Sequence, residues 1–235
     1  MAYRDRYKLK PLRVRAWLRT GVVADEYLPL DGILLYQAHR DLHGAQEMTI
    51  PGEYTRQGIS TLPLGIANPG RKGWYYQCSW AQWSHEIEGK DHWNKRFDTK
   101  YADLVDFAGR RGKVIVEQGR YRAFHMPVFY RCALWIDWYC IGDEKEIAYL
   151  LSTVTHMGKK AAQGWGRITR WEIERADDDW SVWRDDVLTR GIPAEEAAKI
   201  GGSFRFQNYG IRPSYWKSNN QMLLAMPGGQ RNADS

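Results

Sequence analysis

The chain has 235 residues, 43% of them hydrophobic and 26% charged, which is the composition of a globular protein with a substantial core. No apolar run approaches the ~20 residues that a membrane-spanning helix needs, and the N-terminus is charged where a signal peptide would be apolar. The 34 Lys and Arg outnumber the 28 Asp and Glu, giving a formal net charge of +6, so we expect a basic cytoplasmic protein without a membrane partner.

The N-terminal segment is strongly basic and predicts a first strand. Residues 1–20 hold seven Lys or Arg against Asp5 alone. Residues 13–23 alternate with the period of two that is typical of a strand. One predicted face is apolar, with Val14, Ala16 and Leu18. The other face is cationic and aromatic, with Arg13, Arg15, Trp17 and Arg19.

The next elements are a helix, an irregular segment and a second strand. Pro29 suits the first position of a helix. Its apolar stripe is formed by Leu30, Ile33, Leu34 and Ala38. Residues 42–73 are rich in Gly and Pro and predict a long irregular excursion. Residues 74–83 predict the second strand, with alternating aromatic residues on one face.

Residues 84–131 form a basic insertion in which aromatic and cationic side chains interleave. Residues 90–131 hold ten Lys or Arg against five Asp or Glu. We expect a hairpin here, with residues 114–116 pairing with residues 121–130 around Gly119. Such a hairpin could lie along an RNA backbone or a neighbouring subunit, although a solvated hairpin would carry charge as well.

The last elements complete a βαββαβ order. Residues 133–141 are apolar on both faces except at Asp137, which predicts a central strand. Asp143 is placed to cap a second helix, and Gly158 is placed to end it. Residues 167–174 predict the final strand. The order indicates an α+β, ferredoxin-like (RRM-like) domain over residues 1–176, with a C-terminal extension, residues 177–235, packed on it.

Neither the cysteines nor the acidic run predicts a metal site. Cys78, Cys132 and Cys140 show no C-x-x-C spacing, so we expect buried, reduced thiols. The run 177–179 consists of three adjacent Asp residues, which do not converge easily on one ion, and a solvated turn is the simpler interpretation. We expect no metal and no cofactor.

The most informative stretch joins the second predicted helix to the final strand. Residues 158–167 read Gly-Lys-Lys-Ala-Ala-Gln-Gly-Trp-Gly-Arg. Its glycines permit close backbone approach and positive φ, its cations suit phosphates, and Trp165 could present an exposed ring. A Walker A loop is excluded because the lysines follow the first Gly, and a Rossmann fingerprint because Thr169 stands where a third Gly is needed. A glycine-rich turn with solvated lysines remains the alternative.

Three short strings carry a resemblance to a known family. Residues 157–168 resemble the glycine-rich loop of CRISPR RAMP proteins, although Ala161 and Ala162 stand where that loop often carries Arg or Ser. Residues 28–36 and 209–216 are similar to segments of the Cas-five-like subunit of type IV CRISPR systems.

The resemblance implies a non-catalytic subunit that holds the 5′ handle of the CRISPR RNA and caps a filament of backbone subunits. It also implies contact with the large subunit, and it leaves open whether target-adjacent duplex DNA is touched. The candidate RNA-binding residues in the loop are Gly158, Lys159, Lys160, Gln163, Gly164, Trp165, Gly166 and Arg167. Those in the first strand are Arg13, Arg15, Trp17 and Arg19. Those in the insertion are Lys95, Arg96, Arg110, Arg111, Arg120 and Arg122.

Two other functions remain as alternatives. A metal-independent endoribonuclease that processes repeat RNA would need an acid, a base and a cation near a 2′-hydroxyl, and His85 and His92 lie in the basic insertion. A protein-only scaffold would instead use the basic surface to bind acidic partners. We expect no catalytic residues, because neither a Ser-His-Asp set nor an H-E-x-x-H string is found.

Overall fold

The computed structural model describes residues 7–43, 62–85, 87–107 and 112–232. The helices are α1 (Leu30–His43), α2 (Glu144–Leu151) and α3 (Ala194–Ile200), with 3-10 turns at Thr99–Leu104, Gly119–Tyr121, Ala161–Gln163 and Ser218–Asn220. The longer strands are β1 (Lys10–Leu18), β5 (Ile87–Lys95), β6 (Phe124–Cys132), β7 (Trp135–Gly142), β8 (Ile168–Arg175), β13 (Phe206–Gly210) and β14 (Gln221–Ala225). The two-residue strands are β2 (Ile66–Ala67), β3 (Tyr75–Tyr76), β4 (Gln82–Trp83), β9 (Trp183–Arg184), β10 (Val187–Leu188), β11 (Ile192–Pro193), β12 (Gly202–Ser203) and β15 (Gln230–Arg231).

The body is built on an antiparallel sheet in the order β4-β7-β1-β8, and the fold is α+β as predicted. β1 and β7 are central, which agrees with the apolar pattern of residues 133–141. The alternation predicted for β1 is also confirmed, because Val14 and Ala16 are fully buried whereas Arg13 and Arg15 lie on the opposite face.

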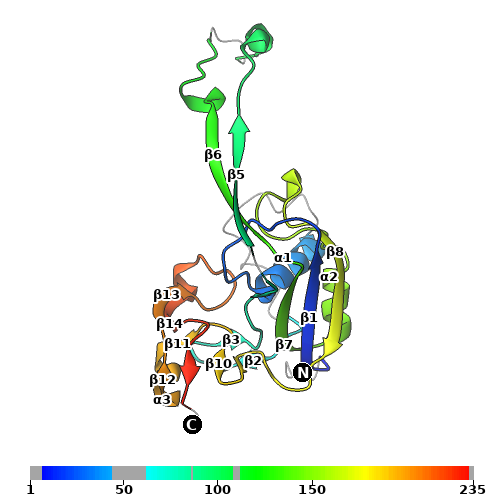
Figure 1. Ribbon diagram of the computed structural model, residues 1–235, viewed down its shortest axis with the longest axis vertical. Coiled ribbons are helices and arrows are strands. Elements are labelled where there is room, and N and C mark those ends of the chain that lie inside the picture. Colours follow the sequence, from blue (N-terminus) through cyan, green and yellow to red (C-terminus); the bar gives the residue numbers. More distant parts are fainter. Residues whose placement is uncertain (1–6, 44–61, 86, 108–111, 233–235) are drawn as a thin grey trace.

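α1 and α2 cover one face of this sheet (Figure 1). Leu30 and Leu34 of α1 and Ile147 and Leu151 of α2 bury their side chains against Val14 and its neighbours. Asp143 caps α2 as predicted, since its carboxylate accepts hydrogen bonds from the backbone N–H groups of Lys145 and Glu146. The predicted end of the helix is wrong: α2 stops at Leu151, and the segment that follows pairs through His156 with Arg167 and through Lys159 with Val23.

Three further predictions need correction. The strand predicted over residues 74–83 is interrupted, because this segment serves two pairings, β3 with β2 and β4 with β7. The predicted excursion lies largely outside the described residues, but Leu62 and Leu64 within it are fully buried core residues. The thiols of Cys78 and Cys140 are buried, and burial raises the pKa of Cys140 to about 12, whereas Cys132 is exposed at the base of the hairpin.

β5 and β6 form a nine-residue hairpin ladder that projects from the body (Figure 1). A hairpin in the insertion is therefore confirmed, but its predicted pairing is wrong. β6 pairs with residues 87–95 instead of residues 114–116. Residues 114–116 lie near the far end, where the Ala123 N–H donates to the Val116 carbonyl. The longer ladder gives each β6 residue a partner, which the three-residue pairing could not.

The C-terminal segment adds a second core beside the sheet. Leu188, Ile192 and Leu224 are buried there together with Tyr75 and Trp80. This core therefore draws on residues from both sides of the domain boundary predicted at residue 177. The boundary itself stays a prediction.

Arg190 links the core of the sheet and helices to the second, C-terminal core. Its side chain is fully buried, donates hydrogen bonds to the carbonyls of Tyr76, Cys78 (3.0 Å) and Ile211 (2.8 Å), and lies 4.5 Å from the Tyr75 ring centre. Burial raises the pKa of the nearby Asp31 carboxyl, and the positive charge of Arg190 partly opposes that rise.

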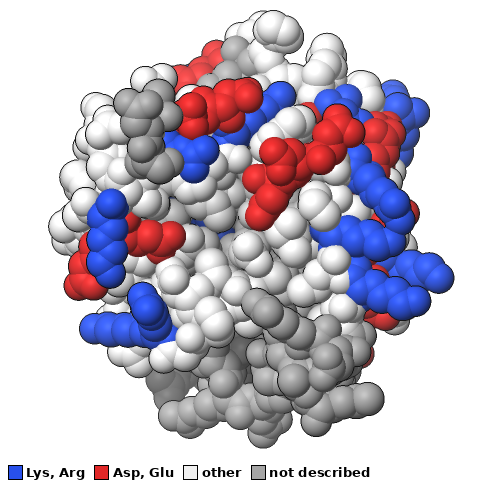
Figure 2. All heavy atoms as spheres, turned by 90° about the horizontal axis from the view of Figure 1, so that it is seen from below, with Lys and Arg blue, Asp and Glu red and all other residues white. Residues whose placement is uncertain are grey.

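The end of the molecule opposite the hairpin shows acidic and basic side chains next to one another (Figure 2). The excess positive charge of the chain therefore does not form a field of one sign on this face. In the described part of the chain, no helix combines the length and apolarity needed to cross a bilayer.

Candidate nucleic-acid interface

Residues 19–23 lie between the glycine-rich loop and the base of the hairpin. On one side, the N–H of Gly166 donates to the Gly21 carbonyl (2.7 Å) and the N–H of Lys159 donates to the Val23 carbonyl (2.6 Å). On the other side, Val22 and Arg131 of β6 exchange two backbone hydrogen bonds, of 2.8 and 3.0 Å. The strand predicted to run to Val23 is therefore shorter, ending at Leu18. Residues 19–23 instead connect the glycine-rich loop with the base of the hairpin, two regions that lie far apart in the sequence.

The three glycines of the loop have different roles. Gly158 and Gly166 have φ values of 77° and 68°, and a Cβ at either position would collide with backbone atoms of the protein itself. These two residues are glycines because of the local fold. Gly164, with φ of 88°, has open space where a Cβ would be and is exposed. Gly158 is exposed as well, but of the three only Gly164 combines exposure with open space on its Cβ side, where a ligand could approach the backbone.

Trp165 is half-buried, so the prediction of a freely exposed ring is wrong. Its ring lies 4.6 Å from that of Tyr130, with an interplanar angle of 35°. A Cβ at Gly21 would lie 3.2 Å from the Trp165 ring and 2.9 Å from the Tyr130 ring. The indole therefore packs the loop against the hairpin base, and the remainder of its surface faces solvent.

The cations of the loop lie at this junction. Lys160, itself in the left-handed conformation with φ of 63°, places its ammonium 4.7 Å from the ring centre of Trp93 on β5. Lys159 is 3.5 Å from Asp25, and both side chains are largely exposed, so this pair is screened and weak. Arg167 and Gln163 are exposed. The loop thus keeps cationic groups in solvent beside two aromatic rings of the hairpin.

The hairpin continues this basic and aromatic surface away from the body. Facing residues of an antiparallel ladder share one side, so Lys90 lies beside Phe129 and Trp93 beside Met126. At the far end, Lys95 donates to the Arg120 carbonyl (2.9 Å). Arg96, Arg120 and Arg122 are exposed there. The predicted residues Arg110 and Arg111 lie outside the described residues.

The open face of the central sheet is different, because its arginines are paired. Arg15 donates two hydrogen bonds of 2.7 Å to Asp137, and its guanidinium lies 4.6 Å from the Trp135 ring centre. These hydrogen bonds raise the pKa of Arg15. Arg13 contacts Glu172 (2.9 Å) and Glu174 (2.7 Å).

Trp17 belongs to the same network, since its indole N–H donates to Glu172 (3.1 Å). The pKa of Glu172 is lowered, first by this hydrogen bond and then by the charge of Arg13. Of the first-strand candidates, Arg13, Arg15 and Trp17 therefore have partners within the protein. Arg19 is exposed, and its N–H donates to the Arg167 carbonyl (2.8 Å) at the edge of the glycine-rich loop.

Several residues of the junction were not predicted from the sequence. Trp93, Tyr130 and Arg131 contact or flank the loop but were not among the candidates. Arg131 also lies 5.8 Å from the Trp83 ring centre and 3.0 Å from Glu88. The correct pairing of β5 with β6 would have placed Tyr130 and Arg131 at the base of the hairpin and Trp93 further along it.

The fold and the site define a basic α+β protein with a candidate surface for single-stranded nucleic acid. The family model described as CRISPR type IV associated protein Csf3 matches residues 10–227, so the chain belongs to that family. This confirms the resemblance to the Cas-five-like subunit of type IV systems. No curated protein matches the chain.

Proposed function

We propose that the chain is a non-catalytic guide-RNA-binding subunit of a type IV CRISPR ribonucleoprotein in the cytoplasm. It holds the 5′ handle of the CRISPR RNA and caps the filament of backbone subunits, next to the large subunit. The observation that carries the proposal is the junction at residues 19–23, where the glycine-rich loop and the basic hairpin meet.

The strand order supports the ferredoxin-like interpretation of the body. Taking β1, β4, β7 and β8 as the four strands of a βαββαβ unit, the second strand lies at one edge and the fourth at the other, with the helices on one face. In this arrangement the loop from α2 to β8 and the loop after β1 lie at the same end of the sheet. That proximity accounts for the contact between residues 19–23 and the glycine-rich loop.

The chemistry of the junction suits single-stranded RNA. Lys159, Lys160 and Arg167 supply positive charge to phosphates, and the accessible backbone at Gly164 permits close approach. Trp93 and Trp165 offer aromatic surface. A strand crossing the loop could continue along the hairpin face that carries Trp93 and Lys95.

The apolar side chains of the hairpin support a second contact, with a neighbouring subunit or with bases of the guide. Ile87, Phe129 and Leu104 are strongly exposed along the hairpin and near its tip. Exposed apolar groups on a projecting element are typical of interaction surfaces. The same basic surface could also contact target-adjacent duplex DNA.

The test replaces Lys159, Lys160 and Arg167 together by Ala and measures binding of single-stranded CRISPR repeat RNA across salt concentrations. Because each phosphate contact contributes about 0.7 to the salt slope for single strands, the slope should fall by about 2 and binding should weaken. The matched control replaces Arg71, Lys72 and Lys199 by Ala, which removes the same charge from exposed residues outside the loop and the hairpin. Equal affinities and slopes for the two triple variants would contradict the proposal.

One observation favours endoribonuclease activity as the second candidate. His92 and His125 stack with ring centroids 4.4 Å apart on the exposed hairpin, on the face of the ladder that also carries Lys90. Two imidazoles on the same face as a cation resemble an acid–base pair for attack by a 2′-hydroxyl. Incubation of the purified protein with repeat RNA in EDTA tests this. A discrete product that is lost in His92→Ala would support the nuclease over the non-catalytic subunit.

A further inference from the structure

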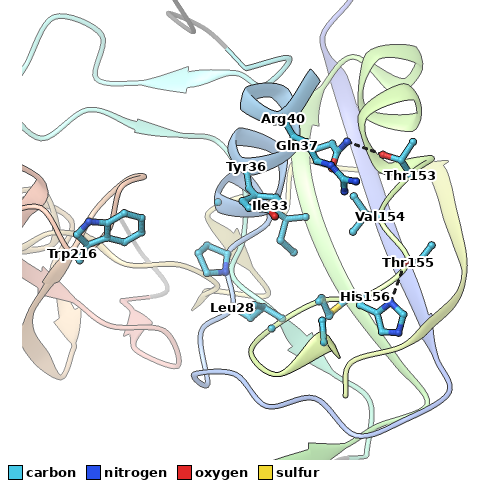
Figure 3. Close-up of a pocket in the computed structure, with 15 residues that line it drawn as sticks. Leu28, Ile33, Tyr36, Gln37, Arg40, Thr153, Val154, Thr155, His156 and Trp216 are labelled. Carbon is cyan, nitrogen blue, oxygen red and sulfur yellow. Dashed lines mark hydrogen bonds between the residues drawn. The ribbon is translucent and has the colours of Figure 1, made fainter. Parts of the chain in front are cut away.

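A groove of about 530 Å³ lies between α1, residues 153–158 and Trp216. In Figure 3, Tyr36 of α1 is seen between Trp216 on one side and the segment from Thr153 to His156 on the other. Leu28, Ile33 and Val154 give the lining a mainly apolar character. A volume of this size exceeds that of one nucleobase several-fold and can hold a nucleotide.

Two aromatic residues of the groove are largely exposed. The side chains of Tyr36 and Trp216 are 53% and 63% exposed, which leaves large ring surfaces in solvent. The same two residues also line an adjoining hollow of about 140 Å³. Exposed rings beside a hollow are typical of a surface that receives a planar ligand by stacking.

The opposite wall is polar and carries hydrogen-bonding groups. The Gln37 side chain donates to the hydroxyl of Thr153 (2.7 Å), and His156 Nδ1 is hydrogen-bonded to the hydroxyl of Thr155 (3.0 Å). Arg40 lies at the rim and is exposed. Among the described residues that line the groove, none is Asp or Glu; Asp41, which accepts from Gln37 (3.1 Å), is outside the lining. This combination suits a base with its phosphate better than an aliphatic segment, which would leave the polar wall unmatched.

The groove is continuous with the surface proposed for RNA. Gly158 and Ala161 belong to the glycine-rich loop and also line the groove. The three strings that resemble the CRISPR family, residues 28–36, 157–168 and 209–216, all contribute lining residues. A strand bound at Lys159 and Lys160 would therefore reach the groove without leaving the protein surface.

We propose that this groove holds one unpaired base of the bound RNA, stacked on Trp216 or Tyr36 and hydrogen-bonded to the wall formed by residues 153–156. The proposal rests on the RNA-binding function above and names where a single nucleotide is recognised. The polar wall makes the site selective for one base, whereas the cations of the loop bind phosphates irrespective of sequence.

The test combines abasic substitution of the RNA with alanine variants of the full-length protein. Repeat RNAs with one abasic position each are compared for binding to wild type, Tyr36→Ala, Trp216→Ala and the control Tyr149→Ala. Tyr149 is 65% exposed on α2 and does not line the groove. One abasic position should weaken wild-type binding about 5- to 100-fold, the range expected for loss of one base–aromatic stack. The same position should have little further effect in Trp216→Ala or Tyr36→Ala, since the stack is already lost.

A fluorescent base analogue at the position so identified gives a second readout that does not depend on affinity. Its emission should be quenched on binding to wild type and to Tyr149→Ala, but not to the variant that lacks the stacking ring. If groove variants bind every RNA as wild type does while the triple loop variant is impaired, the base site is refuted and the RNA-binding function stands. If groove variants lose only binding to a partner subunit, the groove is a protein-docking site and the proposal is wrong. If even the loop variant binds normally, the RNA-binding function itself has failed.

Discussion

Two regions of this protein are rich in cationic and aromatic side chains, but the cations on the open face of the sheet are more fully paired with carboxylates than those at the junction. On the open face of the sheet, Arg13 and Arg15 are matched by carboxylates of β7 and β8 at 2.7 to 2.9 Å. At the junction of loop and hairpin, Lys160 faces an aromatic ring, and Arg167 is exposed. A carboxylate partner satisfies a cation within the fold, whereas a cation beside an aromatic ring remains available to phosphate. Composition alone therefore does not identify an RNA surface.

The largest expected effect comes from removing a partner on the open face. Asp137→Ala removes both hydrogen bonds of the Arg15 guanidinium. Because the Arg15 side chain is only 15% exposed and that of Asp137 only 10%, water replaces the lost partner poorly. We expect a loss of about 3 kcal/mol in the free energy of unfolding, measured by urea denaturation. RNA affinity of the folded variant should be unchanged.

The control for this prediction is Glu174→Ala, in which the carboxylate removed is 56% exposed and contacts Arg13. Exposed pairs contribute little, so the loss should stay below about 1 kcal/mol. A folded Asp137→Ala protein that loses RNA affinity while the triple loop variant does not would reverse the assignment of the two regions.

A smaller effect is expected from disturbing the junction. Gly21→Ala places a methyl group 2.9 Å from the Tyr130 ring and 3.2 Å from the Trp165 ring, so both rings must shift away from position 21. We expect about 1–3 kcal/mol of destabilisation, the usual cost of overpacking. Hydrogen exchange should show faster opening of the hairpin base. RNA affinity should fall as well, because the loop and the hairpin would no longer hold a fixed relative position.

The matched control for the junction is Gly70→Ala, at an exposed turn with no atom within 4 Å of a new Cβ but with φ of 77°. This variant introduces backbone strain without touching the interface. It should alter stability modestly and leave RNA binding as in wild type. Equal losses of RNA affinity in the two variants would show that Gly21 acts through general stability and not through the junction.

The difference between the two regions also explains what the sequence could and could not predict. The faces of β1 and the cap at Asp143 depend on neighbours a few residues away, and both were predicted correctly. The partners of Arg13 and Arg15 lie 122 to 161 residues further along the chain, so their contacts depend on strand register. Without that register, Arg13, Arg15, Lys159 and Lys160 look equivalent.

The prediction of the strand pairing in the hairpin failed for a related reason. Residues 114–116 are a short apolar stretch just before β6, and local hydrophobicity favoured them as its partner. The observed partner, residues 87–95, is polar and largely exposed on both faces, so it gives no burial signal of its own. Its pairing is set by the ladder of backbone hydrogen bonds, which the side-chain pattern does not reveal.

The smallest predicted effect tests the charge matching on the open face through pH. The pKa of Glu172 is lowered in the folded protein, chiefly by the Trp17 hydrogen bond, so the folded state favours its ionised form. This stabilisation is present above the ordinary Glu pKa of 4.5 and is lost as the pH falls through the lower, folded value. The Glu172→Gln variant lacks this stabilisation at every pH. The melting temperature of wild type should therefore exceed that of the variant near neutral pH, and the difference should shrink as the solution is acidified below pH 4.5. A difference that is constant with pH would mean that the carboxylate acts by shape alone, and the contrast with the junction would lose its electrostatic basis.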